Sequence, residues 1–131
     1  MTKMRTALIH QAIRMSWGPD TAMGEWDSCN PALNQCAVTA LIVQDYFGGE
    51  LLRCPMSDGD SHYWNRTADG EVDLTASQFK HIEPQPLKSE TAVRDRDYVL
   101  SFPDTARRYR ILQRRVDNMI ASLQLADWDR G

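Results

Sequence analysis

The sequence predicts an α+β fold, in which a buried central helix packs on a small antiparallel sheet and a further helix lies at each end of the chain. Three observations predict this class. Residues 3–16 and 104–125 repeat apolar side chains at helical spacing, residues 36–47 are apolar almost throughout, and residues 50–75 are short β-like runs separated by turn residues. We expect a single domain over residues 1–131, a length that can bury a core of its own.

The predicted N-terminal helix covers residues 3–16 and is amphipathic. Its apolar positions, at spacings of three and four, are Met4, Leu8, Ala12 and Met15, with Ile9 and Ile13 alongside. Residues 17–19 are Trp-Gly-Pro and end the helix. Residues 18–35 are rich in Gly, Pro, Asp, Asn and Ser, which predicts an ordered loop.

The predicted central helix runs from Cys36 to about Phe47 and is apolar on nearly every side, which is typical of a buried helix. Two glycines at positions 48 and 49 end it. The three β-like runs that follow are Glu50–Cys54, Ser61–Arg66 and Glu71–Thr75. The Asp-Gly pair at positions 69 and 70 predicts a hairpin between the second and third runs.

The C-terminal third of the chain predicts a connection followed by a long helix. Residues 83–90 contain two prolines and form the connection. The helix covers about Asp104–Leu125, with Asp104 as its N-cap after a proline. Its apolar face consists of Tyr109, Leu112, Val116, Ile120 and Leu123. A cluster of arginines predicts a solvated helix face and comprises Arg107, Arg108, Arg110, Arg114 and Arg115.

Composition excludes several classes of function. The net charge of −3 gives no basic excess, so we expect no nucleic-acid partner. The N-terminus has no continuous apolar stretch typical of a signal peptide, and no segment approaches the roughly 18 apolar residues that span a bilayer. A cytoplasmic protein without membrane contact is therefore expected. Three cysteines and no secretion signal argue against a disulfide framework, which leaves at least one free thiol.

Cys36 stands where the loop ends and the buried helix begins. The positive end of the helix dipole stabilises a thiolate there, and the unpaired N–H groups of the first turn can donate hydrogen bonds to an oxyanion. Cys36 is therefore the candidate nucleophile. The structural alternative is a small buried residue at the start of a core helix, since cysteine is among the most buried residue types.

His62 and Asp73 are the candidate partners of Cys36. His62 begins the second β-like run, from which it can point towards the start of the central helix and serve as a base. Asp73 lies on the third run, where the hairpin brings it within cross-strand reach of His62 and lets its carboxylate fix the imidazole tautomer. The alternatives are a half-buried strand histidine bonded to the backbone and a surface aspartate.

Side-chain amides before Cys36 are candidates for an oxyanion or substrate-binding donor. Gln35 precedes the cysteine directly, and Asn30 and Asn34 lie in the same loop. Each can equally be a loop or capping residue. A zinc site built from Cys29, Cys36, Cys54 and His62 is a further alternative, but the spacing lacks a C-x-x-C or H-x-x-x-H pattern. We therefore expect neither a metal nor another cofactor.

Several motifs together resemble the YunG-like family of small bacterial proteins. They are Asn30–Leu41, Gln44–Gly49, Ser61–Asn65, Val72–Thr75, Phe79 and Phe102–Tyr109. The Cys, His, Asp order is similar to that of the papain-like and transglutaminase-like superfamily, in which a cysteine opens a central helix and the other two residues follow on strands. Papain-like proteases usually carry a glutamine six residues before the nucleophile, where this chain has Asn30.

The residues and the resemblance together favour a cysteine enzyme with a Cys36, His62, Asp73 triad. The reaction implied is hydrolysis or transfer at a peptide, amide or other acyl bond through a thioester. The alternative is a binding or regulatory module that retains the fold without catalysis.

Overall fold

The computed structural model describes residues 2–79 and 85–128, with side chains described through residue 123. Its α-helices are α1 (Lys3–Ser16), α2 (Cys36–Phe47), α3 (Arg96–Leu100) and α4 (Pro103–Trp128). The strands are β1 (Glu50–Pro55), β2 (Ser61–Thr67), β3 (Gly70–Val72) and β4 (Ala92–Arg94), and the short 3-10 helices are η1 (Ala76–Phe79) and η2 (Lys88–Glu90). The α+β class and the antiparallel sheet are confirmed.

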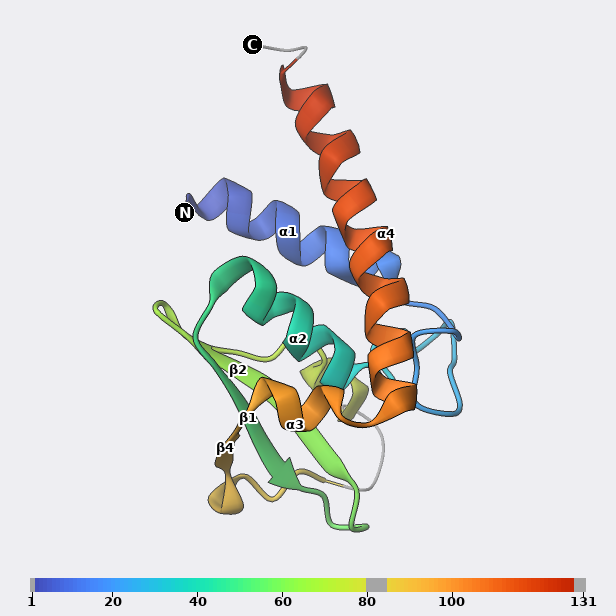
Figure 1. The fold of residues 1–131 in the computed structure, drawn as a ribbon, viewed down its shortest axis with the longest axis vertical. Helices are drawn as coiled ribbons and strands as arrows, with labels where there is room; N and C mark the ends of the chain where they lie inside the picture. Colours follow the sequence, from blue (N-terminus) through green and yellow to red (C-terminus); the bar gives the residue numbers. More distant parts are fainter. Residues whose placement is uncertain (1, 80–84, 129–131) are drawn as a thin grey trace.

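The sheet has the order β3-β2-β1-β4, with every neighbouring pair antiparallel. Helix α2 lies across one face of this sheet, and α1 and α4 lie on the side of α2 that faces away from it (Figure 1). The start of α2 points towards the end of the sheet where the β1–β2 turn lies (Figure 1). This arrangement places the first residue of α2 near the first residues of β2.

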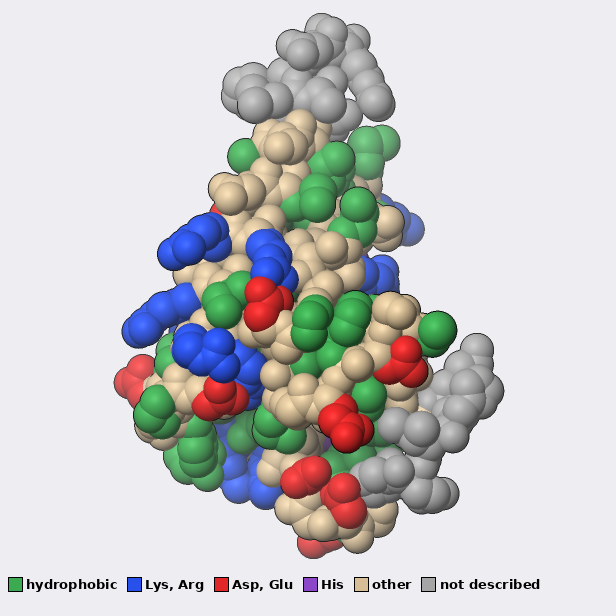
Figure 2. All heavy atoms as spheres, turned by 90° about the vertical axis from the view of Figure 1, so that its right-hand side faces the viewer, with side chains coloured by type: hydrophobic (Ala, Val, Ile, Leu, Met, Phe, Trp, Pro, Cys, Tyr) green, Lys and Arg blue, Asp and Glu red, His purple; other side chains and the backbone are tan. Residues whose placement is uncertain are grey.

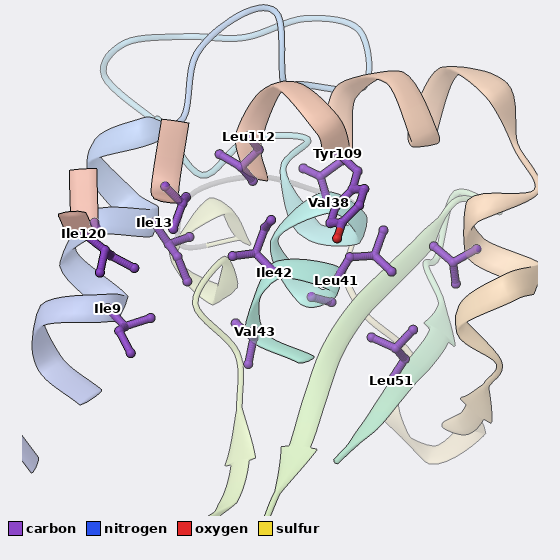
Figure 3. Close-up of a cluster of buried hydrophobic side chains, with 14 residues drawn as sticks. Ile9, Ile13, Val38, Leu41, Ile42, Val43, Leu51, Tyr109, Leu112 and Ile120 are labelled. Carbon is purple, nitrogen blue, oxygen red and sulfur yellow. The ribbon is translucent and has the colours of Figure 1, made fainter. Parts of the chain in front are cut away.

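The core is centred on α2, as its apolar sequence predicts. Six consecutive residues of this helix, 38–43, are buried. Side chains from α1, α4 and β1 converge on them (Figure 3), including Ile9, Ile13, Tyr109, Leu112, Ile120 and Leu51. A helix enclosed on nearly all sides is a rigid support. The residue that opens it is therefore held in a fixed position.

The predicted apolar face of α1 is wrong in part. Met4 and Met15 are 76% and 57% exposed, whereas the buried residues are Ile9, Ala12, Ile13 and Ser16. The buried set has the i, i+3, i+4, i+7 pattern that lines one helix face. The stripe through the two methionines lies to one side of this buried face and shares only Ala12 with it.

The third strand ends earlier than predicted. β3 stops at Val72, so Asp73 lies one residue beyond the strand instead of within it. The Asp73 side chain accepts a hydrogen bond from the backbone N–H of Thr75 at 3.3 Å. This Asx-turn bends the chain away from the sheet and replaces the predicted continuation of the ladder.

The start of α4 also differs from the prediction. The helix begins at Pro103, and the carbonyl of Phe102 accepts the first helical hydrogen bond, from Ala106. Proline suits the first helical position because its fixed φ is helical and its missing N–H needs no partner. Asp104 is therefore inside the helix and is not the N-cap.

Two short elements, β4 and α3, were not expected from the sequence. β4 has only three residues and pairs with β1 at the sheet edge, and α3 has five. Neither is long enough to show a hydrophobic period.

Of the predicted connection 83–90, residues 83 and 84 lie outside the described residues. None of the helices in the described part of the chain combines the length and apolarity needed to cross a membrane.

Candidate active site

Cys36 is the first residue of α2, as predicted, and its side chain is partly exposed. Its Sγ lies 3.8 Å from the backbone carbonyl oxygen of Ser61, to which the thiol can donate a weak hydrogen bond. Ser61 directly precedes His62 at the start of β2. The packing of α2 on the sheet thus brings the candidate nucleophile beside the candidate base.

His62 is only 1% exposed and is held on three sides. Its ring stacks on Trp64 at 5.4 Å between centroids and meets the edge of Phe79 at 4.7 Å. Its Nε2 lies 2.7 Å from Oδ2 of Asp73, and because a carboxylate accepts, Nε2 carries the hydrogen. Nδ1 is buried and has no hydrogen-bond partner among the described residues. The nitrogen that is left for proton exchange is therefore Nδ1.

The charge state of His62 is set by opposing effects. Burial lowers the pKa of His62, but the Asp73 carboxylate and the Cys36 side chain more than offset this and raise the pKa to about 9. The imidazole is therefore largely protonated at neutral pH. Cys36 raises the pKa of His62, but no hydrogen bond joins the two side chains. Hydrogen bonds between catalytic residues are often long or unformed before substrate binds.

This raised pKa predicts how stability depends on pH. The folded state keeps the His62 proton up to about pH 9, whereas an unfolded histidine loses it near pH 6.5. The stabilisation is therefore complete below about pH 6.5 and is lost as the pH rises towards 9, by on the order of 2–3 kcal/mol. Urea unfolding from pH 6 to 9.5 should show this fall in the wild type but not in His62→Gln. Parallel curves for the two proteins would contradict the raised pKa.

Asp73 is held in place by its own turn. The backbone N–H and the hydroxyl of Thr75 both donate to Oδ1 at 3.3 Å, which leaves Oδ2 for His62. Lys88 lies 4.0 Å from Oδ2 and is half exposed. Asp73 thus reaches His62 from a turn, although the prediction placed it on a paired strand. The structure thus brings Cys36, His62 and Asp73 to one place.

Of the three candidate oxyanion donors, Gln35 and Asn30 are not brought to this site, and Asn34 lines the pocket but donates its Nδ2 to the backbone carbonyl of Glu25 at 2.7 Å. Gln35 is fully buried, where its Oε1 accepts from the Thr21 hydroxyl at 2.7 Å and its Nε2 donates to the Gly18 carbonyl at 3.0 Å. These bonds tie the preceding loop to the start of α2. Asn30 uses its Nδ2 to donate to the backbone carbonyl of Gln78 at 3.4 Å. Neither Gln35 nor Asn30 lines the pocket described next.

Cys36 and His62 line a pocket of about 500 Å³. Its walls are largely apolar and include Met23, Leu33, Met56, Phe79, Val99 and Phe102. Asp58 and Asp60 of the β1–β2 turn also line it. Acidic side chains gather at the lower end of the molecule in the view of Figure 2, the end at which Figure 1 shows the β1–β2 turn. A mostly apolar pocket with a few polar groups is typical of a small-molecule or peptide side-chain site.

Gln78 is a pocket residue that sequence reasoning missed. It lies in η1, is 5% exposed, and its Oε1 accepts the backbone N–H of Asn34 at 3.2 Å. Asn34 donates from a left-handed backbone conformation, with φ of 62°. The Nε2 of Gln78 has no hydrogen-bond partner among the described residues. A four-residue 3-10 helix has no sequence period, so no pattern marks this glutamine.

Arg108 is a second missed pocket residue, and its predicted solvated position is wrong. It is 2% exposed, and its Nε donates to Asp104 at 2.8 Å. One terminal nitrogen also donates to the Thr21 carbonyl at 3.3 Å. Arg108 therefore closes one wall of the pocket by joining α4 to the loop before α2.

The other cysteines lie in different settings. Cys29 is exposed, whereas Cys54 is buried, and burial raises the pKa of the Cys54 thiol. The alternative zinc site would need both of them beside Cys36 and His62. Within residues 2–79 and 85–123, no group of three or more His, Cys, Asp or Glu side chains is arranged to hold a metal ion.

Comparison with known proteins identifies the family. Residues 5–121 match the model of the family described as YunG protein. The uncharacterized protein YunG of Bacillus subtilis (strain 168) is 33% identical over 78 residues, which are 59% of this chain and 66% of that protein. No solved structure is a significant match. Because the family match extends over most of the sequence, this chain belongs to the YunG family.

Proposed function

We propose that this chain is a cysteine enzyme that cleaves or transfers an acyl group through a thioester on Cys36. The observation that carries the proposal is a partly exposed thiol at a helix start, beside a buried His62 that is bonded to Asp73, in the wall of an apolar pocket. A nucleophile, a base and a residue that orients the base are the parts this chemistry requires.

In the proposed reaction, Nδ1 of His62 holds the proton that leaves the Cys36 thiol. The thiolate sulfur bonds to the substrate carbonyl carbon, and the carbonyl π electrons move to the oxygen. When this intermediate collapses, the bond to the leaving nitrogen or oxygen breaks, and the leaving group takes the Nδ1 proton. Water or another acceptor, deprotonated by Nδ1, then attacks the thioester carbonyl carbon. The bond from that carbon to the Cys36 sulfur breaks, and the sulfur takes the proton back from Nδ1.

The resemblance to papain-like and transglutaminase-like enzymes supports this proposal at the level of arrangement. As in those enzymes, the cysteine opens a central helix and the histidine follows on a strand that packs against it. The aspartate here follows from a turn beyond β3. The pocket walls suit an apolar acyl group or an apolar side chain of a peptide substrate.

The proposal is tested with p-nitrophenyl acetate, a small activated acyl donor. We expect the wild type to release p-nitrophenol and to carry one acetyl group on the Cys36 peptide in a mass spectrum of the quenched protein. Cys36→Ser should carry none, whereas Cys29→Ser should behave as the wild type, because Cys29 is exposed and lies in the loop. Acetylation at Cys29, or none at all, would instead favour a binding module without catalysis.

A further inference from the structure

The Gln78 side-chain amide is a buried hydrogen-bond donor without a described acceptor. Its residue is 5% exposed, and Nε2 makes no hydrogen bond among the described residues. Buried polar groups are almost always paired, so an unpaired one at a pocket wall calls for an explanation. The same pocket is lined by Cys36 and His62.

The orientation of this amide follows from its other bond. Oε1 accepts the backbone N–H of Asn34, at 3.2 Å, and a backbone N–H can only donate. A flipped amide would set its NH₂ group against that N–H, so the unpaired end is the nitrogen. The donor is therefore fixed by the hydrogen bond, and it is available to a ligand.

The contacts of Gln78 connect it to the segments that carry Cys36 and His62. Asn34, which holds its oxygen, lies two residues before Cys36. The next residue, Phe79, contacts the His62 ring at 4.7 Å between centroids. The Gln78 backbone N–H donates to the carbonyl of Thr75, whose own N–H holds Asp73. One short segment thus carries the Gln78 amide and positions the carboxylate.

We propose that Gln78 is a catalytic residue whose Nε2 donates a hydrogen bond to the oxyanion formed when Cys36 attacks a carbonyl. The inference rests on the proposed acyl transfer. It identifies the side chain that donates to the oxyanion, which the sequence alone does not. Free N–H groups in the first turn of α2 are the natural second donor. Nε2 has no acceptor among the described residues and its amide is already oriented by Asn34, which is the preorganisation such a site needs.

The other amides near Cys36 do not fit this role. The Nε2 of Gln35 donates to the Gly18 carbonyl, and the Nδ2 of Asn30 donates to the Gln78 carbonyl. The Nδ2 of Asn34 donates to the Glu25 carbonyl at 2.7 Å. Arg108 also lines the pocket and could donate to an oxyanion, but its guanidinium donates to Asp104 and to the Thr21 carbonyl. Of these donors, only that of Gln78 is unpaired.

The experiment compares two reactions of the same thiol. Iodoacetamide alkylates Cys36 by displacing iodide and forms no oxyanion, whereas p-nitrophenyl acetate acylates it through one. We expect Gln78→Ala and Gln78→Glu to lower the ratio of the acylation rate to the alkylation rate by roughly 10²–10³-fold. Asn118→Ala, at an exposed amide on α4 that does not line this pocket, is the amide control and should keep the wild-type ratio. Thermal unfolding checks that each variant folds.

Gln78→Glu separates catalysis from a purely structural role. Its carboxylate still accepts the Asn34 N–H but cannot donate to an oxyanion. A wild-type ratio in Gln78→Glu would overturn the proposal, because the glutamine would then matter only as an acceptor. If the ratio is unchanged while the wild type is acylated on Cys36, Gln78 fails and the proposed function stands. If the wild type is not acylated on Cys36, both are refuted.

Discussion

We expect His62→Ala to lower the rate of Cys36 acylation by p-nitrophenyl acetate by roughly 10²–10⁴-fold, the usual contribution of a positioned acid-base group. In the folded protein His62 stays protonated to about pH 9, since Asp73 and Cys36 stabilise the imidazolium. Its removal takes away both the acceptor of the thiol proton and the donor to the leaving group. The measurement is single-turnover release of p-nitrophenol at neutral pH.

His10 provides the matched control for this substitution. It lies on α1, where its ring contacts Phe47, and it does not line the pocket. His10→Ala should therefore acylate at the wild-type rate. Because His62 is buried, His62→Gln serves as a second variant that preserves more of the volume, and both must unfold cooperatively. An acylation rate within about twofold of the wild type in folded His62→Gln and His62→Ala would exclude His62 as the base, since the base contributes at least about 10²-fold.

Asp73→Asn should lower the acylation rate by roughly 10²–10⁴-fold while leaving the protein folded. The reason lies in the two donors of Thr75. They both bind Oδ1 of Asp73, so the amide oxygen of an asparagine stays with them and its NH₂ group turns towards His62. That donor favours a bare Nε2 and a hydrogen on Nδ1, the tautomer that cannot take the proton of Cys36.

Asp69→Asn is the matched control for Asp73→Asn. Asp69 is exposed in the β2–β3 turn, close in sequence but outside the pocket. Its substitution should change neither the acylation rate nor, beyond about 0.5 kcal/mol, the free energy of unfolding. If Asp73→Asn were as silent as this control, Asp73 would be a surface residue without a role in orienting His62.

The elements with strong patterns could be predicted from the sequence. α2 begins at Cys36 and ends at Phe47 as expected. An apolar run of this length between a polar loop and two glycines predicts a buried helix with these ends. Elements shaped by tertiary contacts could not be predicted. β4 exists because β1 offers an open edge, and the buried face of α1 is decided by its contact with α4. The α+β fold class is established, whereas a papain-like fold within that class stays a proposal.

The site could be predicted where chain order and local geometry decide it. The sequence predicts that Cys36 begins a helix and that His62 follows a turn. The predicted hairpin brings Asp73 close to His62. Gln78 could not be found, because its place depends on an Asx-turn and on a backbone N–H some forty residues earlier in the chain. The predicted donor Gln35 failed for a related reason, since loop packing uses both ends of its amide.

The central claim is that Cys36, His62 and Asp73 act as one unit, and alkylation of the thiol tests it without a known substrate. The measurement is the rate at which iodoacetamide modifies Cys36 as a function of pH in the wild type, Asp73→Asn and His62→Ala. A thiolate beside an imidazolium reacts at lower pH than an isolated thiol. We predict that alkylation begins at the lowest pH in the wild type, at a higher pH in Asp73→Asn and at the highest in His62→Ala. Three superimposable curves would show that neither residue is coupled to the thiol and would contradict the triad.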